Sequence, residues 1–82
     1  MLLEWSPAAI KDAAALQEQD RERVARAIER FAVTGHGDVT RLTGKDREMR
    51  LKVGPWRVRF KVEGDTMKIQ RVLRRREDTY KV

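Results

Sequence analysis

The chain contains no cysteine and a single histidine, His36, among its 82 residues. Disulfide bonds and thiolate metal sites are therefore excluded, and we expect no zinc site, no other metal site and no cofactor. No apolar run is long enough to span a bilayer, and no signal-peptide pattern precedes the first polar residues. We therefore expect a cytoplasmic protein that does not contact a membrane. The sequence has no internal repeat and no low-complexity linker, so residues 1–82 are expected to form one domain.

Positive charge is concentrated in the second half of the chain. Residues 1–40 carry five Lys or Arg and seven acids, a net charge of −2. Residues 41–82 carry fourteen Lys or Arg and six acids, a net charge of +8, so the whole chain has the formal net charge of +6. A positive potential confined to one part of a protein favours a polyanionic partner, and a solvated, solubilising surface is the alternative.

The segment from Met49 to Val62 alternates apolar and basic residues on both sides of the turn signal Gly54-Pro55. Successive side chains of a strand point to opposite faces, so the pattern predicts an antiparallel hairpin with one apolar and one basic face. The apolar face is expected to bury at least five large side chains. The basic face consists of Arg50, Lys52, Arg57, Arg59 and Lys61.

The first half of the chain predicts one strand and a helical hairpin. Residues 2–5 indicate a strand, and Ser6 and Pro7 are suited to the cap and first position of a helix. Residues 8–17 are alanine-rich and are expected to be helical, with Ile10 in a narrow apolar stripe. A second helix is expected over residues 21–33 after Asp20 as its cap. Its buried stripe should contain Val24, Ala27, Ile28 and Phe31, at the spacing of one helical face.

The remaining segments complete a sheet. A connecting loop is expected up to about Asp46, with Leu42 anchored in the core, and a further strand over residues 66–73 with a bulge near Arg71. The order strand, helix, helix, strand, strand, strand predicts a two-layer α+β domain. Its antiparallel-rich sheet is covered by the two helices on the apolar face, and the basic face remains open.

The chain resembles the RelE/ParE toxin superfamily over essentially its whole length. The resemblance is carried by the order of elements, the run Arg41-Leu42-Thr43-Gly44, the basic hairpin and the closing R-R-R-E-D-T-Y. A RelE-like fold would imply a ribonuclease toxin that cuts messenger RNA in the ribosomal A site. It would also imply a cognate antitoxin, and binding to operator DNA only as the toxin–antitoxin complex. ParE-type members share the fold, poison DNA gyrase and usually lack the nuclease residues.

The resemblance also implies roles for individual residues. Arg50 and Lys52 match cations near the scissile phosphate, although RelE-type toxins commonly have lysine at the position of Arg50. Arg57 matches the arginine that stabilises the phosphate, and Arg74 the arginine that assists the leaving group. Tyr80 matches a tyrosine that stacks on a base and helps to activate the nucleophile. The register within Arg74-Arg75-Arg76 is open by one residue.

The residues themselves suit a metal-independent cleavage of RNA. The 2′-OH attacks the adjacent phosphate, and arginines aimed at its oxygens stabilise the developing charge. Lys52 is the first candidate for the general base, because neighbouring cations disfavour its charged form, and Tyr80 is the second. Arg59, Lys61, Arg75 and Arg76 are expected to contact substrate phosphates. Two other functions remain open: gyrase inhibition without hydrolysis, and a nucleic-acid-binding module that only follows the backbone.

Overall fold

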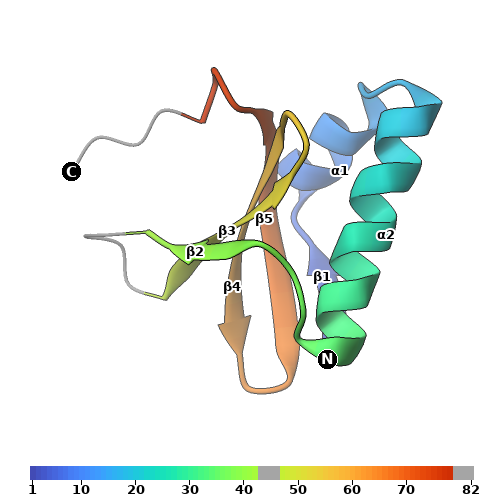
Figure 1. Cartoon of the computed structure of the whole chain (residues 1–82). Coiled ribbons are helices and arrows are strands. Elements are labelled where there is room, and N and C mark those ends of the chain that lie inside the picture. Colours follow the sequence, from blue (N-terminus) through green and yellow to red (C-terminus); the bar gives the residue numbers. More distant parts are fainter. Residues whose placement is uncertain (43–46, 79–82) are drawn as a thin grey trace.

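Two helices cover one face of a five-stranded sheet in the computed structural model, which describes residues 1–42 and 47–78 (Figure 1). The sheet has the order β1-β5-β4-β3-β2, in which β1 is parallel to β5 and the other neighbours are antiparallel. The predicted α+β class is confirmed. The elements are β1 (Leu2–Trp5), α1 (Pro7–Ala14), α2 (Glu18–Thr34), β2 (Val39–Arg41), β3 (Glu48–Val53), β4 (Trp56–Glu63) and β5 (Thr66–Arg74).

The ends of the helices follow local rules with two exceptions. The Ser6 hydroxyl accepts the N–H of Ala9 at 3.0 Å, and Pro7 occupies the first turn, as predicted. Gly35 ends α2 in the left-handed region at φ +75°, where its N–H donates to the carbonyl of Phe31. However, α1 ends at Ala14 and α2 begins at Glu18, so the predicted cap Asp20 lies inside the helix.

One short strand was not predicted. Residues 39–41 form β2, where a loop was expected, and Val39, Thr40 and Arg41 pair with Leu51, Arg50 and Met49. Three residues are too few to display a period-two pattern, so only the pairing with β3 identifies them as a strand. Leu42 follows β2 and is buried, as predicted.

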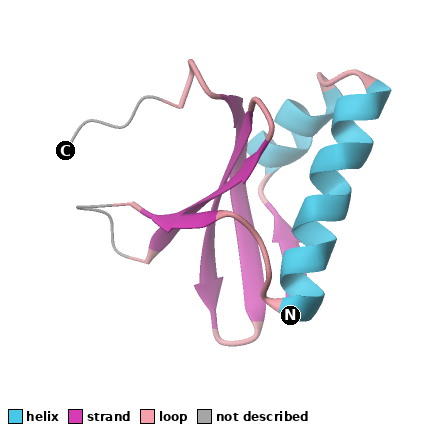
Figure 2. Cartoon of the chain, in the orientation of Figure 1, coloured by secondary structure: helices cyan, strands magenta, loops and turns pink. Residues whose placement is uncertain are grey.

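The core lies between the helices and the inner face of the sheet (Figure 2). The Phe31 and Phe60 rings meet edge to face with their centroids 5.1 Å apart. Ile10, expected in the stripe of the first helix, is instead 57 % exposed. No helix in the described part of the chain is long and apolar enough to cross a membrane. The hairpin buries the five large residues that the alternation required: Leu51, Val53, Trp56, Val58 and Phe60.

A bulge in β5 changes which side chains share a face. Arg59 pairs with Arg71, and its neighbour Phe60 pairs with Ile69, so Gln70 is an extra residue on β5. The predicted bulge near Arg71 is therefore confirmed. Its consequence is that alternation restarts one residue later, which turns Val72 toward the core.

Gly54→Ala and Gly64→Ala should destabilise the fold by similar amounts. Both glycines are left-handed, at φ +57° and +59°, and an alanine there costs about 1–2 kcal/mol. A Cβ on Gly54 would lie 2.6 Å from Nη1 of Arg23, but this atom is the end of a flexible side chain that can move aside, and nothing lies within 4 Å of a Cβ on Gly64. Urea unfolding of both variants, with and without Arg23→Ala, measures the two losses. A much larger loss for Gly54→Ala that Arg23→Ala relieves would contradict this expectation.

Candidate nucleic-acid interface

The predicted cations lie together on the sheet face that is opposite to the helices. Arg50 pairs with Arg59 and Lys52 with Arg57 across β3 and β4, and directly paired residues share a face. The residues between them along the strands belong to the core, so these four side chains start from the outer face. Lys61 lies further along β4 on the same face.

A carboxylate from the C-terminal segment lies between two of these arginines. The side chain of Asp78 is fully buried, and its Oδ2 lies 2.5 Å from Nε of Arg50. Its Oδ1 accepts the Nε–H of Arg59. The Arg50 contact is an ion pair without hydrogen-bond alignment, since neither Arg50 Nε nor Asp78 Oδ2 has a hydrogen-bond partner among the described residues. The centre of the basic face therefore contains two cations and one anion, so it is not purely cationic.

The second pair of cations lies beside the β3–β4 turn. Lys52 is exposed, whereas Arg57 is only 9 % exposed. Nη1 of Arg57 donates to the carbonyl of Gly54 at 2.8 Å and to that of Trp56 at 2.9 Å. These bonds fix the guanidinium before any ligand arrives, and they leave Lys52 as the more accessible charge of the pair.

Acids balance the cations at the far end of the same face. Glu48 lies directly opposite Lys61, and Lys68 of β5 pairs with Lys61 on its other side. Nζ of Lys68 lies 2.6 Å from a carboxylate oxygen of Glu63. The hydrogen bond from Lys68 and its charge hold the pKa of Glu63 below its usual range. Positive potential therefore increases along the hairpin toward the β3–β4 turn.

The C-terminal arginines do not all reach this face. Arg74 pairs with Trp56, and its guanidinium carbon lies 4.9 Å from the centroid of the indole, on the helix side of the sheet. The expected grouping of Arg74 with Lys52 is therefore not found. The backbone of Arg75 is tied to the turn by a 2.8 Å bond from its N–H to the carbonyl of Pro55, and Arg76 is exposed. Tyr80 lies outside the described residues.

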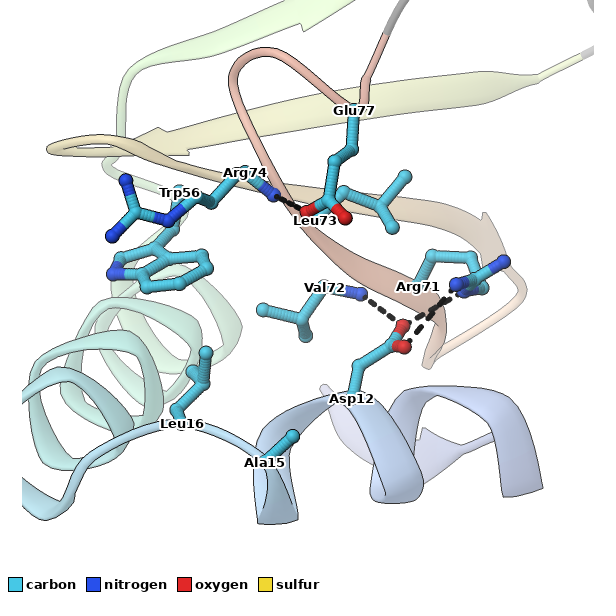
Figure 3. Close-up of a pocket in the computed structure, with 9 residues that line it drawn as sticks. All are labelled: Asp12, Ala15, Leu16, Trp56, Arg71, Val72, Leu73, Arg74 and Glu77. Atoms are coloured by element: carbon cyan, nitrogen blue, oxygen red, sulfur yellow. Dashed lines mark hydrogen bonds and ion pairs between the residues drawn. The ribbon is translucent and has the colours of Figure 1, made fainter.

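A cavity of about 370 Å³ lies on the helix side, between α1 and the end of β5 (Figure 3). Its charged groups bind one another: Asp12 accepts from Nε of Arg71 at 2.7 Å and from the N–H of Val72 at 2.9 Å. The N–H of Arg74 likewise donates to Glu77 at 3.1 Å. The contacts of Asp12 join α1 to β5.

The outer face thus presents an exposed amine, Lys52, beside the fixed guanidinium of Arg57. No group of three or more His, Cys, Asp or Glu in residues 1–42 and 47–78 is placed to hold a metal ion. A family model described as the ParE toxin of type II toxin–antitoxin systems, parDE, matches residues 3–79. The chain belongs to this toxin family.

Solved structures share the fold of this toxin at low sequence identity. The RelB–RelE antitoxin–toxin complex of Methanococcus jannaschii matches with a TM-score of 0.77 and 24 % identity, over 90 % of this chain and 92 % of that one. The isolated E. coli RelE toxin matches with a TM-score of 0.77 and 16 % identity, over 89 % of this chain and 82 % of that one. A chromosomal ParDE system of P. aeruginosa matches with a TM-score of 0.70 and 20 % identity, over 90 % of this chain and 95 % of that one. No protein with a curated function matches the toxin significantly in sequence.

Sequence reasoning missed the position of Asp78 in the toxin. Its carboxylate reaches across the sheet to Arg50 and Arg59, which are 28 and 19 residues away in the chain. The available signal was compositional: Glu77 and Asp78 are the only acids in a closing segment that is otherwise basic.

Stability of the toxin should fall in acid partly through Asp12. Although burial raises the pKa of Asp12, its hydrogen bonds from Arg71 and Val72 and the charge of Arg71 bring it below the ordinary value. A lowered folded pKa stabilises the fold above the unfolded value of about 3.9, and this contribution is lost as pH falls through the folded value. We expect on the order of 1 kcal/mol, because Arg71 is half exposed.

The measurement compares wild type with Asp12→Asn by urea unfolding between pH 7 and pH 2.5. The difference in unfolding free energy should be constant above pH 5 and should shrink below about pH 4. Asp65→Asn, a substitution at an acid that is 85 % exposed, serves as the control and should show little change. A pH-independent difference for Asp12→Asn would refute the ion pair with Arg71.

Proposed function

We propose that this toxin is a metal-independent, ribosome-dependent endoribonuclease that cleaves messenger RNA by attack of the 2′-OH on the adjacent phosphate. The observation that supports it is the pair Lys52–Arg57, which combines an exposed amine with a fixed guanidinium on one rung of the outer face. A nuclease that uses the 2′-OH of its substrate needs a proton acceptor and a fixed positive charge within a few ångströms of one phosphate. Paired positions on adjacent strands lie about 5 Å apart, which suits a single phosphate group.

Each residue has a distinct role in the proposed reaction. Lys52, in its neutral form, accepts the proton of the 2′-OH as that oxygen attacks phosphorus. Arg57 stabilises the negative charge that develops on the non-bridging oxygens, and the bond from phosphorus to the 5′-oxygen breaks. The products are a 2′,3′-cyclic phosphate and a 5′-OH. A cation near the 5′-oxygen neutralises it until it takes up a proton.

That cation is Arg75 rather than Arg74 in our proposal. The backbone of Arg75 is tied to the turn beside Lys52 and Arg57, whereas Arg74 stacks on Trp56 on the other side of the sheet. This choice stays within the one-residue register that the sequence left open. Tyr80 keeps the role that the resemblance implies, stacking on a base and assisting the nucleophile. Lys61 and Arg76 are assigned to flanking phosphates.

We also propose a cognate antitoxin as the physiological partner, and binding to operator DNA only through the toxin–antitoxin complex. Three of the similar solved structures are described as RelB–RelE complexes, which supports such a partner. The toxin has a net charge of +6, and an acidic amphipathic segment that folds on binding would complement it. A short acidic reading frame next to the gene would strengthen this assignment.

A second candidate function is inhibition of DNA gyrase without hydrolysis. It is favoured by the ParE toxin match over residues 3–79 and by the burial of Arg57, which limits its contact with a phosphate. The two functions differ in what the toxin damages. Purified toxin that blocks supercoiling by gyrase and leaves ribosome-bound mRNA intact would establish the second function in place of the first.

Lys52→Ala should slow cleavage of mRNA in the A site of programmed ribosomes by about 10²–10⁴-fold, the range typical for loss of a general base. Because Lys52 is exposed, the fold should be unaffected. Primer extension over a time course with excess toxin measures the rate, and circular dichroism checks the fold. Lys11→Ala, which removes an exposed lysine from α1, is the matched control and should cleave at the wild-type rate.

Two outcomes would reject the proposal. If wild-type toxin never cuts ribosome-bound mRNA, the enzyme is misassigned. If wild type cuts and Lys52→Ala cuts equally fast, Lys52 is not the base and the chemistry must lie elsewhere on the face.

A further inference from the structure

The arginine pair Arg50–Arg59 is an anion site that the chain itself fills. The carboxylate of Asp78 is fully buried between the two guanidinium groups, each of which is about one-fifth exposed. Both arginines use their Nε atoms toward this one carboxylate. Two facing guanidinium groups are a favourable site for a phosphate, whose oxygens match their geometry. A carboxylate in this position therefore occupies the place that a phosphate would take.

The segment that carries Asp78 is held by the hydrogen bonds of a local turn, whereas the strands of the sheet are held by pairing with one another. The N–H groups of Glu77 and Asp78 donate to the carbonyl of Arg74 at 2.9 and 3.0 Å, which makes a local turn after β5. This turn lies on the side of the sheet away from the helices (Figure 1). Residues 75–78 lie beyond the last paired residue of β5, so lifting Asp78 from the arginines breaks no rung of the strand ladder.

We propose that Asp78 is an internal counter-ion, which occupies a phosphate site formed by Arg50 and Arg59 until a backbone phosphate of a bound RNA strand displaces it. The choice of RNA rests on the proposed function. When the phosphate binds, the two guanidinium groups exchange one anion for another and Asp78 returns to water. The free toxin thus weakens its own basic face, and only a strand that is already held nearby gains this second contact.

The spacing of the two cationic rungs supports this displacement. The rung Arg50–Arg59 is two residues from the rung Lys52–Arg57 on each strand, which is about 6.7 Å along the sheet. Successive phosphates of a single nucleic-acid strand have a comparable spacing. A strand anchored at Lys52 and Arg57 therefore presents its next phosphate to Arg50 and Arg59 at a high effective concentration, which competes with the tethered carboxylate.

Asp78→Asn should increase the affinity of the toxin for a single strand. The probe is a fluorescein-labelled 2′-O-methyl hexanucleotide, in which the attacking hydroxyl is blocked, and the measurement is fluorescence anisotropy at low salt. If Asp78 occupies the site about nine-tenths of the time, its removal raises the affinity about tenfold. Asp65→Asn makes the same change in net charge at an exposed acid and is the matched control. Equal affinities of the two variants would overturn the proposal.

A measurement on wild type keeps the test valid if Asp78→Asn does not fold. The Nε–Hε NMR signals of Arg50 and Arg59, assigned by single Arg→Lys variants, should both shift as the hexanucleotide is added. The signal of Arg26, which pairs with Glu22 on the surface of α2, should not move. No shift of the Arg50 and Arg59 signals at saturation would overturn the proposal. Equal shifts with hexaglutamate would also overturn it, since the site would then accept an acidic peptide.

These binding readouts separate this inference from the nuclease proposal. Toxin that never cleaves ribosome-bound mRNA but shows the arginine shifts would reject the nuclease and retain the displaced counter-ion. Toxin that cleaves but shows no shift would reject the counter-ion and retain the nuclease.

Discussion

The register of β3 against β4 is the constraint on which the rest of the structure depends. Because side chains alternate with period two, a slip of β3 by one residue against β4 would move Leu51 and Val53 into water and bury Arg50 and Lys52 under the helices. Burial of unpaired cations costs far more than any gain in the turn, so only one register is compatible with a core. The apolar residues that hold the fold together thus also decide where the cations lie.

The sequence was sufficient to predict features that repeat along the chain. Alternation predicted the hairpin and its five buried residues, helical spacing predicted Val24, Ile28 and Phe31, and Ser6 marked the start of a helix. Features set by a single distant contact were not predictable. The carboxylate of Asp78 reaches its arginines only because the turn after β5 folds back over the sheet, and no local pattern encodes that fold-back.

The position of Arg74 shows how one extra residue redirects chemistry. Without the bulge, alternation from Met67 and Ile69 would place residue 74 on the outer face with Lys52. The insertion of Gln70 reverses this phase, so Val72 enters the core and Arg74 stacks on Trp56. A bulge near Arg71 was predicted, yet its effect on the faces follows only from the exact pairing. Sites carried over from a family by sequence spacing are therefore least secure beyond a bulge.

A basic face that is partly neutralised from within is compatible with a toxin that acts on a positioned substrate. In the proposed function, free RNA in solution must supply the energy to displace Asp78 from its own contacts, whereas a strand held by a large scaffold has already lost its translational freedom. In that proposal the internal carboxylate weakens binding to bulk RNA more than to a strand presented next to Lys52 and Arg57. On this view selectivity arises from a contact that the protein makes with itself, and the scaffold supplies what the isolated domain lacks.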